Sequence, residues 1–261
     1  MKNLIINICL ICFIICTALQ LFSCNTNEKD KNEESDTIKR ITGDETSVDI
    51  ESNPILSLFK KTSELPFTID STYFSKLTES EDFVRLRTKE VKVLTTSFNK
   101  YEKFSNIEWN LKSFFELDSM KEAGTYEEYK NIIDIGMTMY SDAYAIEKFK
   151  LGPNTFALIW IISYSTMDAC PYASGDIVFL SIFQSETITD CIQIGENMSS
   201  GDPPSSMSKT LTSSINDNLI IQFSFIEIYE EEDYETMELI NEKNTDNFSA
   251  KIKEGIVIFE K

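Results

Sequence analysis

Carboxylates are the side chains most able to do chemistry in this chain, because the 261-residue sequence contains no histidine. Histidine is the most frequent general base near neutral pH and the most frequent metal ligand in proteins. Its absence excludes Ser-His-Asp and Cys-His catalysis as well as conventional zinc sites. Any catalysis would therefore rest on Asp, Glu, Lys, Tyr or Cys side chains.

Three aspartates flank the most hydrophobic stretches of the chain, namely Asp168, Asp176 and Asp190. A pair of carboxylates at a suitable separation can hydrolyse a glycosidic bond, so these residues are the first candidates for such a pair. With 43 Asp and Glu residues in the chain, however, some pair will reach a workable separation by number alone. The pattern therefore assigns no catalytic residue, and a carboxylate-dependent hydrolase stays an alternative.

An acidic run, Glu230-Glu231-Glu232-Asp233 with Glu235 after it, could attract Ca²⁺, which prefers several carboxylate ligands. The run lacks the alternating Asp and Asn ligands and the glycine of a calcium loop. A charge run between two strands is more often a solvated turn. We therefore predict no metal site and no cofactor, and the sequence contains no glycine-rich phosphate loop.

Two cysteines fall in the part of the chain expected to fold, Cys170 and Cys191. In an exported protein two thiols allow a disulfide. If Cys191 lies in the middle of a strand and Cys170 in the loop before the preceding strand, they are too far apart for that bond. An aspartate lies near each cysteine and no basic residue does, which predicts thiols of raised pKa and low reactivity.

The first half of the folded part contains helical signals. Asn53 and Pro54 start a short helix, Leu65 to Asp70 is extended, and Asp70 or Ser71 caps a further turn. Residues 79–104 are ambiguous, since 83–86 suits a helix and 91–94 suits a strand. Residues 106–117 and 125–133 have helical periodicity, and the aromatic stripe of the second segment is expected in the core.

The second half contains strand signals. Residues 143–150 and 155–165 predict a hairpin whose second strand is covered on both faces. Strands follow at 176–184 and 188–195, then a long polar loop at 195–210, then strands near 218–229, 234–241 and 248–259. The sequence thus predicts an α+β fold with short N-terminal helices in residues 54–137. Residues 138–261 form an antiparallel β-meander, curled toward a half-barrel, and residues 54–261 together form one globular unit.

The N-terminus is read as a targeting segment. Lys2 precedes an apolar run that extends to Phe22, which is the order of a secretory signal peptide over residues 1–23. The run also approaches the length of a transmembrane helix, so an uncleaved anchor is the alternative. Residues 24–53 are rich in charge and contain few large apolar side chains, which predicts a disordered acidic tether.

Leu21-Phe22-Ser23-Cys24 resembles the lipobox of bacterial lipoproteins, although Phe22 stands where a small residue is usual. Together with the acidic tether and the aromatic-rich meander, it resembles the uncharacterised lipoproteins of Bacteroidota. That resemblance implies diacylglyceryl attachment at Cys24 and a place at the outer membrane. Three triplets also resemble the O-glycosylation motif of these bacteria: Asp36-Thr37-Ile38, Asp70-Ser71-Thr72 and Asp118-Ser119-Met120.

The formal charge of the chain is −19, which argues against a nucleic-acid partner because phosphate contacts need clustered Lys and Arg. We expect a non-catalytic binding or accessory lipoprotein, held at the membrane by its lipid and able to bind a protein or glycan. The alternative is a hydrolase acting on envelope or dietary glycans. A structure would separate the two through the presence of a carboxylate-lined cleft.

Overall fold

The computed structural model describes residues 53–79, 83–99, 101, 104, 107–134, 137–166, 172–202, 204–232, 236 and 238–260. The expected signal peptide, almost all of the tether, Cys24 and the Asp36 triplet lie outside these residues. Asp168, Cys170, Asp233 and Glu235 also lie outside them. No helix in the described part of the chain is both long and apolar enough to cross a bilayer.

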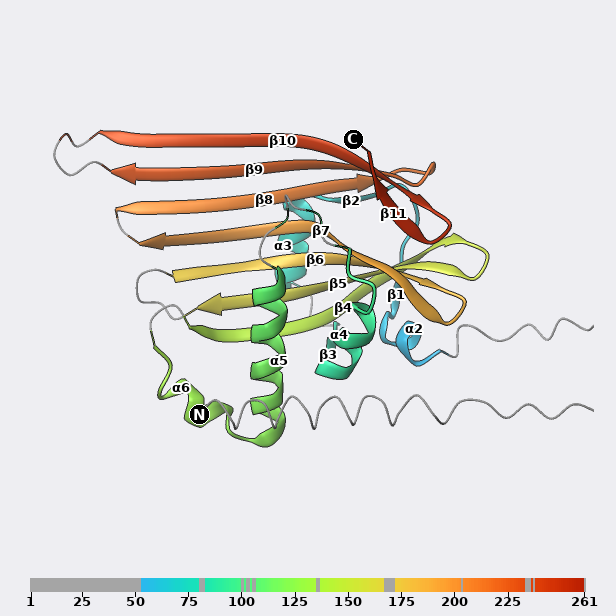
Figure 1. The fold of residues 1–261 in the computed structure, drawn as a ribbon, viewed down its shortest axis with the longest axis horizontal. Coiled ribbons are helices and arrows are strands. Elements are labelled where there is room, and N and C mark those ends of the chain that lie inside the picture. Colours follow the sequence, from blue (N-terminus) through green and yellow to red (C-terminus); the bar gives the residue numbers. More distant parts are fainter. Residues whose placement is uncertain are drawn as a thin grey trace, which may run out of the picture. The chain divides into compact units, whose positions relative to one another are not determined.

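The fold is α+β, as the sequence predicts, with short helices first and a long antiparallel meander after them (Figure 1). The helices are α2 (Pro54–Leu58), α3 (Ser71–Glu79), α4 (Thr88–Leu94), α5 (Ile107–Ala123) and α6 (Tyr126–Lys130). The short strands are β1 (Lys61–Thr62), β2 (Phe67–Ile69) and β3 (Val84–Leu86). The meander contains β4 (Thr138–Gly152), β5 (Thr155–Thr166), β6 (Tyr172–Gln184), β7 (Thr187–Asp202), β8 (Ser205–Ile215), β9 (Ile220–Glu232), β10 (Leu239–Lys253) and β11 (Ile256–Phe259).

The strands of the described residues form one sheet in the order β1-β4-β5-β6-β7-β8-β9-β10-β11, with β3 also on β4 and β2 also on β8. β1 runs parallel to β4, and the other pairs are antiparallel. The sheet curls but does not close, since its two outermost strands do not pair with each other. β7 stays beside β8 only from Glu196 to Asp202. Beyond that point β2 takes the place of β7 beside β8, at Ser213 to Ile215.

Both faces of the sheet are covered at one end. α2, α4 and α5 pack on one face over a core that includes Trp160 and Phe179, whereas β2 and α3 pack on the other. β5 is therefore buried on both sides, which explains why its sequence is apolar almost throughout. The prediction of a doubly covered strand is confirmed.

Other elements occupy much of the outer edge of β4. β3 pairs with it at Ala143 to Ala145, and β1 pairs at Glu147 and Lys148. Farther along the same strand, side chains replace a neighbouring strand as hydrogen-bond donors to backbone carbonyls. The Tyr129 hydroxyl donates to the Thr138 carbonyl at 3.0 Å, the Tyr126 hydroxyl to that of Met139 at 2.7 Å, and the Lys121 Nζ to that of Ser141 at 3.2 Å.

The start signals of the first two helices are confirmed. The Asn53 side chain accepts from the Ile55 amide at 2.9 Å, and the Asp70 carboxylate accepts from the Tyr73 amide at 2.9 Å. In residues 79–104 the local patterns favoured a helix at 83–86 and a strand at 91–94, and the structure shows the reverse. Val84–Leu86 is a strand beside β4, and Thr88–Leu94 is a helix that buries Val91 and Leu94 one turn apart. Tertiary packing here outweighs the β propensity of valine.

Two predictions in the second half are wrong. The expected polar loop at 195–210 is largely strand, since β7 continues to Asp202 and β8 begins at Ser205. The last expected strands, 234–241 and 248–259, are instead the long β10 and the short β11. In both places polar residues suggested turns, but in residues 197–201, 205–210 and 239–245 only Gly201 is buried, so these parts of the strands need no apolar alternation.

The aromatic stripe expected in the core is also misplaced. No residue of α6 is buried, and Ile132 just after it is 78 % exposed. Tyr126 and Tyr129 use their hydroxyls on the β4 carbonyls instead of filling a core position. The helix is confirmed only from Tyr126 to Lys130, shorter than the predicted 125–133, and the prediction that its aromatic face is buried is wrong.

Candidate functional site

The two described aspartates of the proposed catalytic set do not meet. Asp176 lies in β6, while Asp190 in β7 pairs with Ile182, six residues farther along β6. At about 3.3 Å per residue that is about 20 Å, whereas glycosidase carboxylates lie about 5 to 10 Å apart. The structure therefore does not place these two residues as one catalytic pair.

Each of these aspartates has its own structural contacts. Asp190 Oδ2 accepts from the Val257 amide at 2.7 Å and Oδ1 from the Cys191 amide at 2.9 Å, which connects β7 to β11. Asp176 Oδ1 accepts from the Ser163 hydroxyl at 2.5 Å. Burial raises the pKa of both carboxyls, although the hydrogen bonds to them act in the opposite direction.

Cys191 is a free thiol in the middle of β7 and is fully buried. Burial raises the pKa of its thiol to about 12, and the nearby Asp190 adds to the shift. The predicted direction is thus confirmed, but the larger cause is desolvation rather than the aspartate. A thiol in this state is a poor nucleophile at neutral pH.

The described part of the acidic run, Glu230 to Glu232, ends strand β9 near the solvent. Glu230 accepts from the Asn241 side chain at 3.0 Å and Glu231 from the Tyr229 hydroxyl at 2.7 Å. In the part of the chain that the structure describes, no group of three or more Asp, Glu, Cys or His side chains is placed to hold a metal ion.

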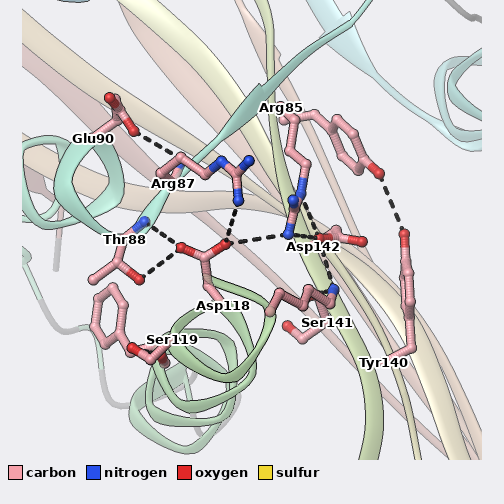
Figure 2. A network of polar contacts seen from close by, with 12 residues as sticks. Arg85, Arg87, Thr88, Glu90, Asp118, Ser119, Tyr140, Ser141 and Asp142 are labelled. Atoms are coloured by element: carbon pink, nitrogen blue, oxygen red, sulfur yellow. Dashed lines mark hydrogen bonds and ion pairs between the residues drawn. The ribbon is translucent and has the colours of Figure 1, made fainter. Parts of the chain in front are cut away.

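A network of charged residues that sequence reasoning missed joins α5 to β3, α4 and β4 (Figure 2). At its centre is Asp118 of α5, which is fully buried. Its Oδ2 accepts from the Thr88 amide at 2.8 Å and the Thr88 hydroxyl at 2.9 Å. Its Oδ1 lies 3.2 Å from Arg85 Nη2 and 3.6 Å from Arg87 Nη1. These contacts fix the start of α4 against α5.

The same network continues through Asp142 of β4. Its Oδ1 accepts from Arg85 Nε at 2.8 Å and from Lys121 Nζ at 3.0 Å. The Lys121 ammonium also lies over the rings of Tyr126 and Tyr140, 4.9 and 5.3 Å from their centroids. Partial burial desolvates both phenols and raises their pKa, so they remain protonated at neutral pH.

This network is better suited to holding elements together than to catalysis. Both Asp118 oxygens accept hydrogen bonds or ion pairs, and one of the two cations beside them, Arg85, also pairs with Asp142. A carboxylate held in this way is not free to take a proton from a substrate. One signal could have found it: Asp118 follows Ile107 and Phe114 on the buried face of α5, where an acidic residue requires a partner.

The glycosylation triplets lie in different settings. Ser119 is exposed on α5 and donates to the Phe115 carbonyl at 2.8 Å, while Asp118 before it is buried in the network. Asp70, Ser71 and Thr72 are exposed at the start of α3, where Asp70 caps the helix. Attachment of a sugar at either place remains a prediction.

A pocket of about 480 Å³ lies beside strand β1 and contains the buried carboxylate of Glu147. Glu147 Oε1 accepts from the Tyr73 hydroxyl at 2.8 Å, and Oε2 accepts from the Ser63 hydroxyl and pairs with Lys61 Nζ at 2.9 Å. Burial and the glutamate together raise the pKa of the Tyr73 phenol. The carboxylate has partners on both oxygens, so it too serves as an anchor for its surroundings.

The remaining surface of interest is one end of the sheet, which we call the distal sheet. It contains residues 172–176 of β6, 197–201 of β7, 205–210 of β8, 226–232 of β9 and 239–245 of β10. Apart from Gly201, none of these residues is buried. The strands extend past α5, to the left in Figure 1, as a single layer.

The distal sheet combines polar and apolar side chains on both faces. The register places Lys209, Glu227 and Asn244 side by side on one face, and Ser208, Ile228 and Lys243 on the other. Leu239 and Ile240 are 65 % and 44 % exposed. An uncovered layer with exposed apolar groups is suited to binding another molecule.

Comparison of the chain with protein-family models, curated proteins and solved structures returned no match.

Proposed function

We propose that this protein is a lipid-anchored, non-catalytic binding protein of the cell envelope that presents its distal sheet to a partner protein. The observation that carries the proposal is the single-layer sheet, in which no residue but Gly201 is buried. Sheets normally gain stability by covering at least one face with another layer. A partner packed on the distal sheet would supply that layer.

The described carboxylates favour binding over catalysis. Asp118, Asp142 and Glu147 each accept from cationic or hydroxyl donors of the chain itself. Asp176 and Asp190 are held separately by hydrogen bonds on different parts of the sheet. No pair among these five is arranged with a free general acid opposite a nucleophile or base, which glycoside hydrolysis requires.

Membrane attachment in this proposal depends on Cys24, which follows the lipobox-like Leu21-Phe22-Ser23. Acylation would hold the chain at the outer membrane, with residues 24–53 as the spacer. The Cys24→Ala variant should lose incorporation of a metabolic fatty-acid label, while the matched Cys170→Ala variant should retain it. Persistent label on Cys24→Ala would contradict the anchor.

Site-specific photo-cross-linking in intact cells tests the binding surface. A photoreactive amino acid would replace Ser199 or Ser208 of the distal sheet in the full chain, with exposed Ser75 of α3 as the control position. We expect a discrete adduct from the two distal positions and none from the control. Equal adducts from all three positions, or none from the distal ones, would argue against the proposal.

The alternative, a hydrolase of envelope or dietary glycans, predicts turnover rather than adduct formation. The full chain would be incubated with polysaccharides of both classes, and release of reducing ends would be measured. We expect no release above that of a heat-denatured sample. Turnover that disappears in Asp176→Asn or Asp190→Asn would overturn the non-catalytic assignment.

A further inference from the structure

The outer edge of β10 differs from every other long edge of the described sheet. β10 pairs with β9 from Leu239 to Lys251, but on its other side β11 covers only Ala250 to Lys253. From Leu239 to Thr245, the segment we call the open edge, no strand lies beside β10 within the described residues. An extended segment can add to such an edge through its main-chain hydrogen bonds.

Charges around the open edge specify the kind of segment that fits. The described residues at this corner of the distal sheet are mostly acidic: Glu230, Glu231, Glu232, Glu238 and Glu242, with Lys243 as the opposite charge. A basic segment would be attracted to this corner, and an acidic one would be repelled. A second copy of this chain is a poor occupant, since it would bring the same carboxylates and a net charge of −19.

The register indicates which side chains an added strand would meet. Ile240 and Glu242 share one face with Glu231 and Tyr229, because those residues pair across β9 and β10. A partner strand would therefore place an apolar residue beside Ile240 and a basic residue beside Glu242, two positions apart. Lys243 points to the opposite face, where it discourages pairing with another basic side chain on that face.

We propose that the open edge of β10, Leu239 to Thr245, receives a basic extended segment of the partner protein as an added β-strand. This inference rests on the proposed function, because it names how that partner engages the distal sheet. The main chain provides the attachment through the amides and carbonyls of β10. Glu242 and its acidic neighbours provide the selection for positive charge.

The test uses the full chain in detergent and a fluorescent eight-residue peptide in which valine and lysine alternate along one face, at every second position, with threonine between them. Binding is measured by anisotropy, and protection of the Leu239–Thr245 amides by hydrogen exchange. We expect binding that weakens as salt is raised, together with slower exchange along the open edge. A peptide with glutamate in place of lysine should not bind, and one methylated on alternate backbone nitrogens should lose binding.

Protein variants locate the contact. Glu242→Gln should weaken binding about fivefold, the value of one cross-strand charge pair. Glu254→Gln, in the exposed turn after β10, is the matched control and should bind like the wild-type chain. Equal binding by the methylated peptide, or equal loss in both variants, would overturn strand addition.

These outcomes separate the two proposals. If Ser199 and Ser208 still cross-link to a partner while the lysine–valine peptide leaves the open edge unprotected, the partner binds a face of the distal sheet and only the strand-addition inference fails. If the cross-links are also absent, the proposed function fails with it.

Discussion

β6 passes through two environments, and the contrast between them separates what stabilises this fold from the surface that we propose for a partner. From Ile177 to Phe183 every residue of the strand is buried. From Tyr172 to Asp176 none is buried. The first stretch lies between two hydrophobic cores. The second is held by strand pairing and by hydrogen bonds of Asp176 with Ser163 and of Ala173 with Thr166. A sheet that is stable at one end can thus extend an uncovered surface at the other.

The difference also appears in the polar contacts. At the covered end, polar groups such as Trp160 Nε1 and Ser181 Oγ are hydrogen-bonded in the interior, with the serine donating on to the Leu94 carbonyl. In the distal sheet, ion pairs such as Lys209 and Glu227, 3.0 Å apart, lie near the solvent. Interior contacts specify the fold, while surface pairs contribute little to stability.

The largest effect should come from a truncation in the covered core. Phe179 is fully buried and stacked on Trp160, with ring centroids 4.2 Å apart, so Phe179→Ala should lower the free energy of unfolding by about 4 kcal/mol. The matched distal change, Ile228→Ala, should lower it by less than about 1 kcal/mol. Urea unfolding followed by circular dichroism measures both. Similar losses at the two sites would erase the contrast between the ends.

A smaller effect is expected from the charged network beside the covered end. Asp118→Ala leaves the Thr88 amide without its side-chain acceptor and removes one of the two carboxylates that pair with Arg85, so it should cost about 3 kcal/mol. Glu116→Ala removes an exposed carboxylate of the same helix, 3.8 Å from Lys112, and should change stability by less than about 0.5 kcal/mol. Equal unfolding midpoints for the two variants would show that the network does not hold α5 in place.

The smallest expected effect on stability depends on pH. It concerns Asp176, which lies in β6 between the covered end and the distal sheet. Burial raises the pKa of this carboxyl, so the native state binds its proton more tightly than the unfolded chain. Its stabilising contribution is present below about pH 4 and is lost as pH rises through the native pKa. Asp176→Asn should therefore gain stability relative to the wild-type chain between about pH 4 and about pH 7.

The control for that pH dependence is Asp217→Asn, in the exposed turn between β8 and β9. Its unfolding midpoint should follow that of the wild-type chain across the same range. A difference between Asp176→Asn and the wild-type chain that stays constant with pH would mean that the Asp176 carboxyl does not titrate differently on folding.

Much of the covered end could be predicted from sequence because burial there leaves a periodic pattern. The hairpin of β4 and β5 and the amphipathic face of α5 follow from apolar residues at the periods of a strand and of a helix. The distal sheet gives no such signal, since both of its faces are exposed. Its Ser-rich strand β8 and the polar middle of β10 therefore suggested loops.

The distal sheet was harder to predict than the covered end for the same reason. Its composition is that of a solvated segment, and what distinguishes it is pairing across successive hairpins, such as that of Asn241 with Glu230. The Asp118 network likewise joins β3, α5 and β4, so no local motif encodes it. The sequence shows where the carboxylates are, but only the topology shows which of them accept hydrogen bonds and ion pairs from other elements.

The side chains along β4 determine how far association can propagate. Tyr126, Tyr129 and Lys121 occupy carbonyls that a further strand would need, and β3 and β1 pair with β4 between Ala143 and Lys148. Linear growth into a filament requires two receptive edges on every molecule. Here a strand added to β10 has no counterpart at β4, so we expect a stoichiometry of one strand per molecule and an assembly that ends after a single addition.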